Sequence, residues 1–284
     1  YSDDYQVSNI SAECNEDEYR AKVEKIKEYI LAGDVYEVNL SQQIKADFSG
    51  NPYQLFNKLY QINDAPFSGY LNFGEQKIIC NSPEMFLQAD GHMLQTRPIK
   101  GTIARSEDED IDTRNRQILL NSSKDEAELF MIIDLLRNDI GKVCKYGSVK
   151  VLEEKRLEAY KNVYHLVGTI SGMMKAEYDY IDLIKATFPG GSITGCPKVR
   201  CMEIIQELES FNRHLYTGSI FIMNQNYLNS NIVIRSGIIC DDQIFFNSGG
   251  AITIDSDAKS EYEETQTKIK SLLQAVKSDG ELLD

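Results

Sequence analysis

The stretch SNIVIRSGIICDDQIFFNSGGAIT, residues 230–253, decides the fold class. It contains two apolar runs that are separated only by the short polar pair Asp241 and Asp242. The pattern predicts strands near 230–239 and 243–253 with a tight turn between them. A turn this short cannot contain a crossover helix, so the two strands are expected to pair antiparallel.

The rest of the chain repeats this arrangement of neighbouring strands with short connections. Further strands are predicted at 35–48, 68–73, 77–80, 92–96, 147–152, 163–171 and 216–223. Helices are predicted at 16–32, 52–62, 124–137, 198–209 and 260–276, and the acidic run 105–112 is expected to be a solvated loop. The last helix carries a buried stripe of Ile269, Leu272, Leu273 and Val276. These elements predict an α+β fold of antiparallel sheets covered by helices, in one catalytic domain spanning residues 1–284.

The composition excludes several classes of function. With 284 residues and a formal net charge of −14, the chain is expected to repel nucleic acid and anionic membranes. No apolar run is long enough for a membrane span and the N-terminus does not resemble a signal peptide, so a cytoplasmic protein is expected. Six cysteines without a C-x-x-C pair and only three histidines disfavour both a zinc site and a disulfide framework.

Two pairs of acidic residues lie at helical spacing. Asp125 and Glu128 are three residues apart in one predicted helix, and Glu261, Glu264 and Lys268 share one face of another. A solvated helix face is the simpler interpretation of either pair alone. Two such pairs in a chain poor in histidine would also suit Mg²⁺, which prefers carboxylate oxygens and keeps several waters.

Other motifs have two interpretations on the residues alone. The segment FPGGSITGCPK, 188–198, opens a helix whose backbone N–H groups favour an anion, or it is an ordinary tight turn. His165 lies in an apolar strand, where a satisfied core histidine is the simpler interpretation. Arg235 ends the predicted strand NIVIR, and the glycines of SGGA at 248–251 allow a backbone to come close to a ligand.

Together, eight segments in the same order over nearly the whole chain resemble the chorismate-utilising enzymes. They are SPEMF (82–86), RPIKGT (97–102), KDEAELFMIIDLLRNDIGKV (124–143), GSVKV (147–151), YHLVGTI (164–170), FPGGSITGCPKVRCMEII (188–205), NIVIRS (231–236) and DSDAKSEYEETQTK (255–268). The resemblance implies two large antiparallel sheets packed face to face, with helices outside and the active site in the cleft between them.

The resemblance also implies roles for individual residues. Glu128 and Glu264 match the Mg²⁺ ligands, with Asp125 and Glu261 at neighbouring positions, and the metal would hold the ring carboxylate of chorismate. His165 matches a histidine near the ring hydroxyl. The positions that match substrate contacts are Gly101, Thr102, Tyr216, Arg235, Gly249, Gly250 and Lys268.

Lys100 of TRPIKGT distinguishes the branches of this family. Anthranilate synthases have alanine in its place, whereas the members that form aminodeoxychorismate typically carry PIKGT. In that branch the lysine is the proposed nucleophile at ring C2, and Glu84 of SPEMF matches the acid that protonates the departing C4 hydroxyl. The resemblance therefore implies that ammonia replaces this hydroxyl, giving 4-amino-4-deoxychorismate for 4-aminobenzoate and folate synthesis. No Gly-x-Cys-x-Gly elbow is visible, so a separate glutamine amidotransferase is expected to supply the ammonia.

The chain departs from the family pattern at several positions. Glu37 stands where relatives of this branch carry glutamine, Cys196 and Cys201 replace alanines, and Ala251 replaces a third glycine. Full-length members also carry a substantial N-terminal segment, so this sequence is either a naturally short form or truncated, and tryptophan regulation is not assumed. Two rival functions are an anthranilate synthase component and a catalytically silent protein that binds chorismate or regulates a partner.

Overall fold

A computed structural model describes residues 4–276 and divides them into two compact units. The first comprises residues up to Pro83, Ile193–Gly218 and the chain from Val233 onward, and the second comprises Glu84–Ser192 and Ser219–Ile232. Each unit contains one seven-stranded antiparallel sheet with its own helices. The predicted α+β class with two antiparallel sheets is confirmed, and the single catalytic domain stays a prediction.

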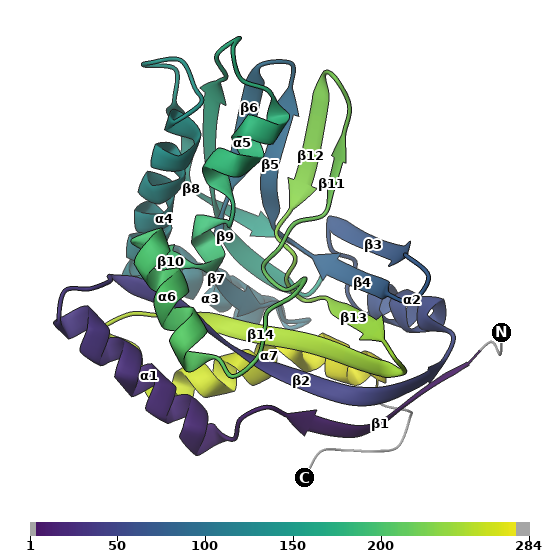
Figure 1. Cartoon of the computed structure of the whole chain (residues 1–284). Helices are drawn as coiled ribbons and strands as arrows, with labels where there is room; N and C mark the ends of the chain where they lie inside the picture. The colour runs from purple at the N-terminus through teal and green to yellow at the C-terminus, as the bar shows by residue number, and fades with distance from the viewer. Residues whose placement is uncertain (1–3, 277–284) are drawn as a thin grey trace. The chain divides into compact units, whose positions relative to one another are not determined.

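The sheet of the first unit is built around two long neighbouring strands, β2 (Glu37–Gly50) and β14 (Gln243–Ile252) (Figure 1). Their register runs from Asp47 opposite Gln243 to Val38 opposite Ile252. The order is β1-β2-β14-β13-β4-β3, and the short β10 also pairs with β2. The remaining bounds are β1 (Tyr5–Ala12), β13 (Gly237–Cys240), β4 (Lys77–Ser82), β3 (Phe67–Asn72) and β10 (Gly195–Cys196).

The helices of this unit within residues 4–276 are α1 (Glu16–Leu31), α2 (Pro52–Ile62), α6 (Lys198–Leu208) and α7 (Ala258–Val276). The side chain of Asn15 caps the start of α1, and Gly33, with φ +83°, follows its end in the left-handed conformation that glycine permits. In α7 the predicted stripe is confirmed, since Ile269, Leu272 and Val276 are buried and Leu273 packs against the same cluster.

A polar belt divides the core under this sheet. On one side Val38, Leu40 and Ile252 belong to a cluster with α1 and α6, and on the other Ile44 and Phe246 belong to a cluster with α2 and α7. Between them the Gln42 amide donates to the Thr265 hydroxyl, and the Ser248 hydroxyl donates to the Thr265 carbonyl at 2.8 Å. A shift of α7 along the sheet would leave the buried polar groups of Gln42, Ser248 and Thr265 without partners, so these hydrogen bonds fix the position of α7.

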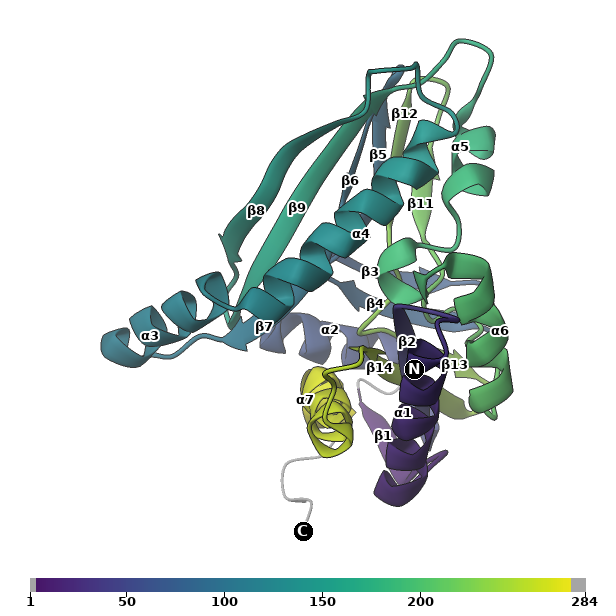
Figure 2. The same ribbon diagram turned by 90° about the vertical axis from the view of Figure 1, so that its left-hand side faces the viewer.

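The sheet of the second unit has the order β11-β12-β5-β6-β9-β7, with β8 also paired to β9. Helix α4 (Ser123–Gly141) packs along β8 and β9, and α3 (Glu109–Leu120) packs beside β7 (Figure 2). Gly168 makes this packing possible, because a Cβ there would lie 2.7 Å from Ile133 Cδ1. The strand bounds are β11 (Phe221–Met223), β12 (Tyr227–Asn231), β5 (Met85–Asp90), β6 (Met93–Arg97), β9 (Val163–Met173), β7 (Ile99–Ala104) and β8 (Lys150–Ala159).

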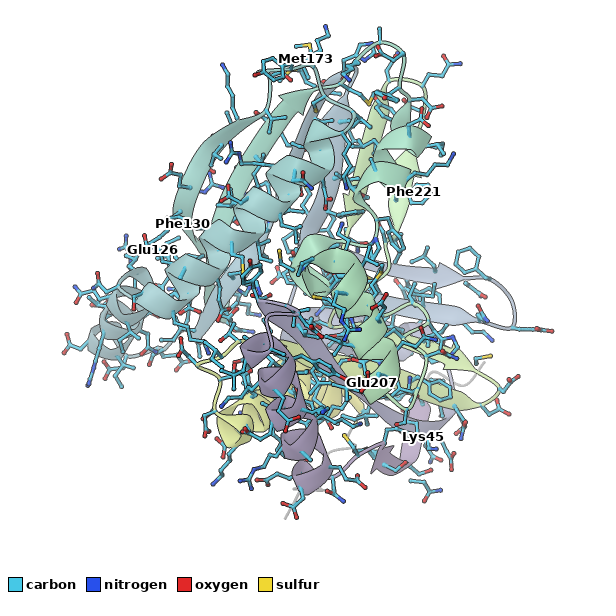
Figure 3. All side chains as sticks on the ribbon, turned by 60° about the vertical axis from the view of Figure 1, so that its left-hand side comes forward. Lys45, Glu126, Phe130, Met173, Glu207 and Phe221 are labelled. Atoms are coloured by element: carbon cyan, nitrogen blue, oxygen red, sulfur yellow. The ribbon has the colours of Figure 1, made fainter. Side chains whose placement is uncertain are left out.

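The outer surface of the second unit carries both charged and apolar side chains. Glu126 and Phe130 lie on α4, and Phe221 lies on the edge strand β11 (Figure 3). Helix α5 (Tyr180–Thr187) also packs against α4. No helix within residues 4–276 is long and apolar enough to cross a membrane.

Three sequence-based expectations are wrong. The predicted strand 216–223 is shorter, because only Phe221–Met223 form a strand, β11. The acidic run 105–112 is not a solvated loop throughout, because Asp108 caps α3 and accepts hydrogen bonds from the N–H groups of Asp110 and Ile111. Acidic residues at a helix start interact favourably with its dipole, which explains their clustering there. Arg235 does not end a strand: it has φ +51° and lies between β12 and β13, where the chain has passed from the second unit to the first.

Candidate active site

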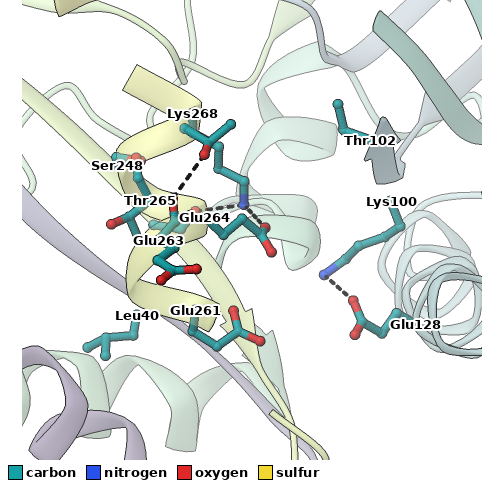
Figure 4. Close-up of polar contacts among 12 residues, drawn as sticks. Leu40, Lys100, Thr102, Glu128, Ser248, Glu261, Glu263, Glu264, Thr265 and Lys268 are labelled. Atoms are coloured by element: carbon teal, nitrogen blue, oxygen red, sulfur yellow. Dashed lines mark hydrogen bonds and ion pairs between the residues drawn. The ribbon is translucent and has the colours of Figure 1, made fainter. Parts of the chain in front are cut away.

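Lys100 is buried on β7 in the second unit. Lys100 is only 8% exposed, and its Nζ lies 3.9 Å from Oε2 of Glu128 on α4 (Figure 4). Strand β7 and helix α4 pack against each other, and this packing holds Lys100 close to Glu128. Lys124 lies one helical turn before Glu128 and also approaches it at 3.9 Å, but its side chain is 52% exposed. The buried lysine of TRPIKGT is therefore not an ordinary surface residue.

Gly101 brings the same segment against the first turn of α4. It has φ +73°, and a Cβ at this position would lie 2.9 Å from both Cγ and Oδ1 of Asp125. The Ser122 hydroxyl caps the helix by accepting from the Asp125 N–H at 3.2 Å. The predicted pair Asp125 and Glu128 therefore lies directly beside Gly101 and Lys100.

Thr102 and His165 face each other across β7 and β9. Thr102 Oγ1 and His165 Nδ1 are 2.8 Å apart, and His165 is 1% exposed. The Tyr160 ring contacts the imidazole edge to face with centroids 5.4 Å apart. Burial and the hydrogen bond to Glu158 raise the pKa of Tyr160 to about 12, so this phenol stays protonated. The imidazole is thus held from both sides.

Glu84 is 4% exposed and receives a hydrogen bond of 2.7 Å from Ser192 Oγ. Ser192 belongs to the segment FPGGSITGCPK, so this segment orients a carboxylate 108 positions earlier in the chain. Sequence reasoning noted the segment but missed Ser192, because nothing in the local pattern indicates so distant a partner.

In the first unit, the charged face of α7 meets the backbone of β14 at Gly250. A Cβ on Gly250 would lie 3.1 Å from Oε2 of Glu261, 3.8 Å from Nζ of Lys268 and 3.9 Å from Oε1 of Glu264. Lys268 contacts Glu264 at 2.6 Å and donates to the Gly249 carbonyl at 2.9 Å (Figure 4). Glu261 is 4% exposed and accepts a 2.7 Å hydrogen bond from Ser256. The two carboxylates and the lysine predicted to share a face do converge.

Tyr216 and Arg235 also belong to the first unit and lie outside its strands. Tyr216 follows Arg213, whose guanidinium carbon lies 5.7 Å from the centroid of the tyrosine ring. Sequence reasoning also missed Arg213, whose side chain is 13% exposed, and its buried carboxylate partner Glu209. Gly249 lies opposite Ser41 of β2, and a Cβ on it would come within 2.5 Å of the Leu40 carbonyl oxygen.

The expected site residues therefore form two sets, one in each unit. The second unit holds Glu84, Lys100, Gly101, Thr102, Asp125, Glu128 and His165, and the first holds Tyr216, Arg235, Gly249, Gly250, Glu261, Glu264 and Lys268. Glu37 is fully buried in the first unit, and Cys201 beside it donates from Sγ to the Glu37 carbonyl at 3.1 Å. Burial raises the pKa of Cys201 to about 12, so this thiol stays protonated.

The donor chemistry of both sets suits a hard cation. Each set contributes two carboxylates one helical turn apart, and the missing side chain of Gly250 leaves space beside Glu261. Within residues 4–276, no group of three or more histidine, cysteine, aspartate or glutamate side chains is positioned to enclose a metal. Mg²⁺ needs no such cage, because it binds through one or two carboxylates and retains waters.

Known proteins resemble this chain over most of its length. It is 43% identical over 97% of its residues to "aminodeoxychorismate synthase component 1" of Bacillus subtilis, and 41% identical over 94% to "anthranilate synthase component 1" of Aquifex aeolicus. The chain spans 59% and 54% of these relatives, respectively. The crystal structure of anthranilate synthase component I from Streptococcus pneumoniae superimposes with a TM-score of 0.85 at 31% identity, covering 93% of this chain and 59% of that one.

The eight sequence segments predict a chorismate-utilising enzyme, and these relatives indicate the same family. Residues 2–274 match the family described as chorismate binding enzyme. With that match and with relatives more than 40% identical over nearly all of its length, the chain belongs to the chorismate binding enzyme family.

Proposed function

We propose that the chain aminates chorismate at C4 with ammonia, giving 4-amino-4-deoxychorismate, and that it is the chorismate-aminating part of an aminodeoxychorismate synthase. The observation that carries the proposal is Lys100, a buried amine beside Glu128 in a segment where anthranilate synthases have alanine. A buried lysine is costly unless it is paired or used, and its place next to Gly101 and Thr102 supports use.

In the proposed reaction, Lys100 Nζ forms a bond to ring C2 and loses a proton, while both conjugated ring double bonds shift and the C4 hydroxyl departs. Glu84 gives its proton to that hydroxyl, which leaves as water. Ammonia then adds at C4 and loses a proton, both double bonds shift back, and Lys100 takes up a proton as it departs from C2. The net change exchanges one hydroxyl for one amino group and keeps the enolpyruvyl ether, so the 4-aminobenzoate needed for folate requires a separate lyase.

The remaining residues would bind and orient the substrate. Arg235 and Lys268 supply positive charge for the carboxylates of chorismate, and Tyr216 and the backbone at Gly249 and Gly250 supply hydrogen-bonding groups. His165, held by Thr102, would lie near the ring hydroxyl. These local cations explain how a dianion binds a protein with a net charge of −14.

We propose that Mg²⁺ is the cofactor, held by Glu128 and Glu264 with Asp125 and Glu261 acting directly or through water. When bound, the ion would neutralise the ring carboxylate of chorismate. The proposal predicts that chelation by EDTA abolishes turnover and that excess Mg²⁺ restores it. Full activity in EDTA, with metal removal verified by elemental analysis, would contradict it.

A glutamine amidotransferase is the proposed partner and source of ammonia. The word "component" in the names of the relatives supports a second subunit. The expected consequence is that the chain alone uses ammonium salts and requires that subunit to use glutamine.

One experiment tests the reaction. The chain is incubated with chorismate, Mg²⁺ and an ammonium salt, and the products are identified by mass. We expect aminodeoxychorismate from the parent and from Lys124→Ala, whose lysine touches the same Glu128 from the surface, and none from Lys100→Ala. Anthranilate with pyruvate would instead make the chain an anthranilate synthase component, and unchanged chorismate would make it a silent binding protein.

A further inference from the structure

An ion pair between the half-buried Arg213 and the buried Glu209 lies outside the residues assigned so far. Arg213 Nη2 lies 2.6 Å from Glu209 Oε1, and Arg213 Nε lies 2.8 Å from Glu209 Oε2. The guanidinium and the carboxylate therefore form a bidentate contact. The side chains are 13% and 1% exposed. Helix α6 ends at Leu208, so this pair is not one of the solvated pairs along a helix face. Bidentate geometry in a buried place fixes the direction of the guanidinium.

The pair joins three segments of the first unit. Arg213 Nη1 donates to the Ile193 carbonyl at 3.0 Å, and Nη2 donates to the Asn39 carbonyl at 2.6 Å. Glu209 Oε1 also accepts from both the N–H and the hydroxyl of Ser41, each at 2.8 Å. Ser41 is the residue opposite Gly249 in the register of β2 and β14. The pair is therefore anchored to the strand that lies against one of the expected substrate contacts.

Tyr216, another expected substrate contact, depends on the same arginine. Its N–H donates to the Arg213 carbonyl at 2.8 Å, and its ring centroid lies 5.7 Å from the guanidinium carbon. His214 and Thr217 on either side have φ of +48° and +62°, which non-glycine residues rarely adopt. Such a turn persists only where its surroundings hold it.

The packing around Tyr216 leaves a small gap. A cavity of about 10 Å³, with room for about one water, lies between Tyr216, Arg213 and Asn247. Among residues 4–276 the Asn247 amide nitrogen has no hydrogen-bonding partner. A buried ion pair contributes little net stability compared with apolar side chains of the same size. A role in shaping the turn explains its presence better than stability does.

We propose that Arg213, fixed by Glu209, is a positioning residue that holds Tyr216 where it binds a carboxylate of the substrate. The inference rests on the proposed function in one respect: it assumes that chorismate is the ligand. It does not depend on which product is formed, because positioning acts on binding.

The test is a double-mutant cycle on chorismate affinity, measured by calorimetry with Mg²⁺ present, together with kcat and KM. Arg213→Lys keeps the charge but loses the fork, and Tyr216→Phe removes the phenol oxygen. We expect each to raise the Kd and the KM about tenfold with kcat changed far less, and the double variant to be no worse than the worse single one. Glu209→Gln is expected to reproduce the effect of Arg213→Lys.

Arg200→Lys is the matched control. Arg200 makes a two-nitrogen contact with Asp34 at 2.7 and 3.2 Å and lies 5.3 Å from the Tyr29 ring, so it has the same kind of partners on the surface of the same unit. We expect Arg200→Lys to bind chorismate with the same Kd as the parent.

The proposal would be overturned by an unchanged Kd in folded Arg213→Lys, or by losses that multiply in the double variant. Failure of both Arg213→Lys and Glu209→Gln to fold would do the same, since the pair would then serve stability alone. Formation of anthranilate by the parent would refute the proposed function and leave the binding cycle intact.

Discussion

Replacing Gly101 by alanine tests the packing of the segment that carries Lys100. The residue has φ +73°, and an added Cβ would lie 2.9 Å from Asp125 Cγ, Asp125 Oδ1 and Leu119 Cδ1. Real Cβ atoms do not approach other heavy atoms so closely, so the Asp125 and Leu119 side chains, or the elements that carry them, must shift. We expect Gly101→Ala to be destabilised and to lose amination.

The magnitude has two parts that a control can separate. A left-handed backbone costs an alanine about 1–2 kcal/mol, and overpacking costs about 1–3 kcal/mol more. Gly147, in the same unit, also has φ +73° but would place its Cβ more than 4 Å from other atoms. Gly147→Ala is therefore expected to lose about 1–2 kcal/mol, and Gly101→Ala about 2–5 kcal/mol.

Urea titration of the parent and both variants measures these differences, with thermal melts as a second probe. Trimming the opposing side chain should relieve the crowding, so Gly101→Ala with Asp125→Ala is expected to cost less than the sum of the single changes. Equal losses at Gly101 and Gly147, or additive losses in the double variant, would refute the contact between Gly101 and Asp125.

Two further predictions concern stability. The pKa of Asp112 is lowered from an ordinary 3.8 to about 2. The largest cause is the hydrogen bond from the Tyr164 hydroxyl, followed by those from the Ser106 N–H and Arg105. This depressed pKa adds stability that is present above pH 4 and is lost as the pH falls towards 2. Tyr164→Phe should therefore melt below the parent at pH 7, and the gap should narrow between pH 4 and pH 2; a constant gap would contradict the assignment. Phe246 is fully buried among β14, β2 and α7, so Phe246→Ala should cost about 3–5 kcal/mol in urea titrations, whereas a loss under 1 kcal/mol would mean that this cluster is not a packed core.

Local sequence patterns predicted most of the elements correctly. The spacing of apolar residues in α1 and α7 and the alternation of strands with short turns are local signals, and they indicate antiparallel sheets covered by helices. The presence of two large sheets was implied by the family resemblance, and β1, β5 and β7 were absent from the predicted strands. The helix α3 was missed because its acidic first turn has the composition of a solvated loop until the cap at Asp108 is recognised. The strand ending at Arg235 was misjudged because an apolar run does not reveal where the chain leaves one sheet for another.

The candidate site was predictable as a set of residues but not as a set of contacts. Asp125 and Glu128, or Glu261 and Glu264, are neighbours on one helix and follow from spacing. The bond between Ser192 and Glu84 joins distant parts of the chain, and no single-sequence pattern reveals it. The family resemblance supplied the roles, which remain proposals until the experiments above are done.

The place of β14 within its sheet has a consequence for biosynthesis. It lies between β2 and β13, although it is the last strand in the described part of the chain. A ribosome that has finished β2 at Gly50 must add the residues up to Gln243 before that edge can be covered, which takes about 10–40 s at about 5–20 residues per second. During this interval the nascent chain exposes an unpaired edge that invites aggregation. Chains truncated before Gln243 should therefore be insoluble and depend on chaperones, even though they contain most of the proposed site residues.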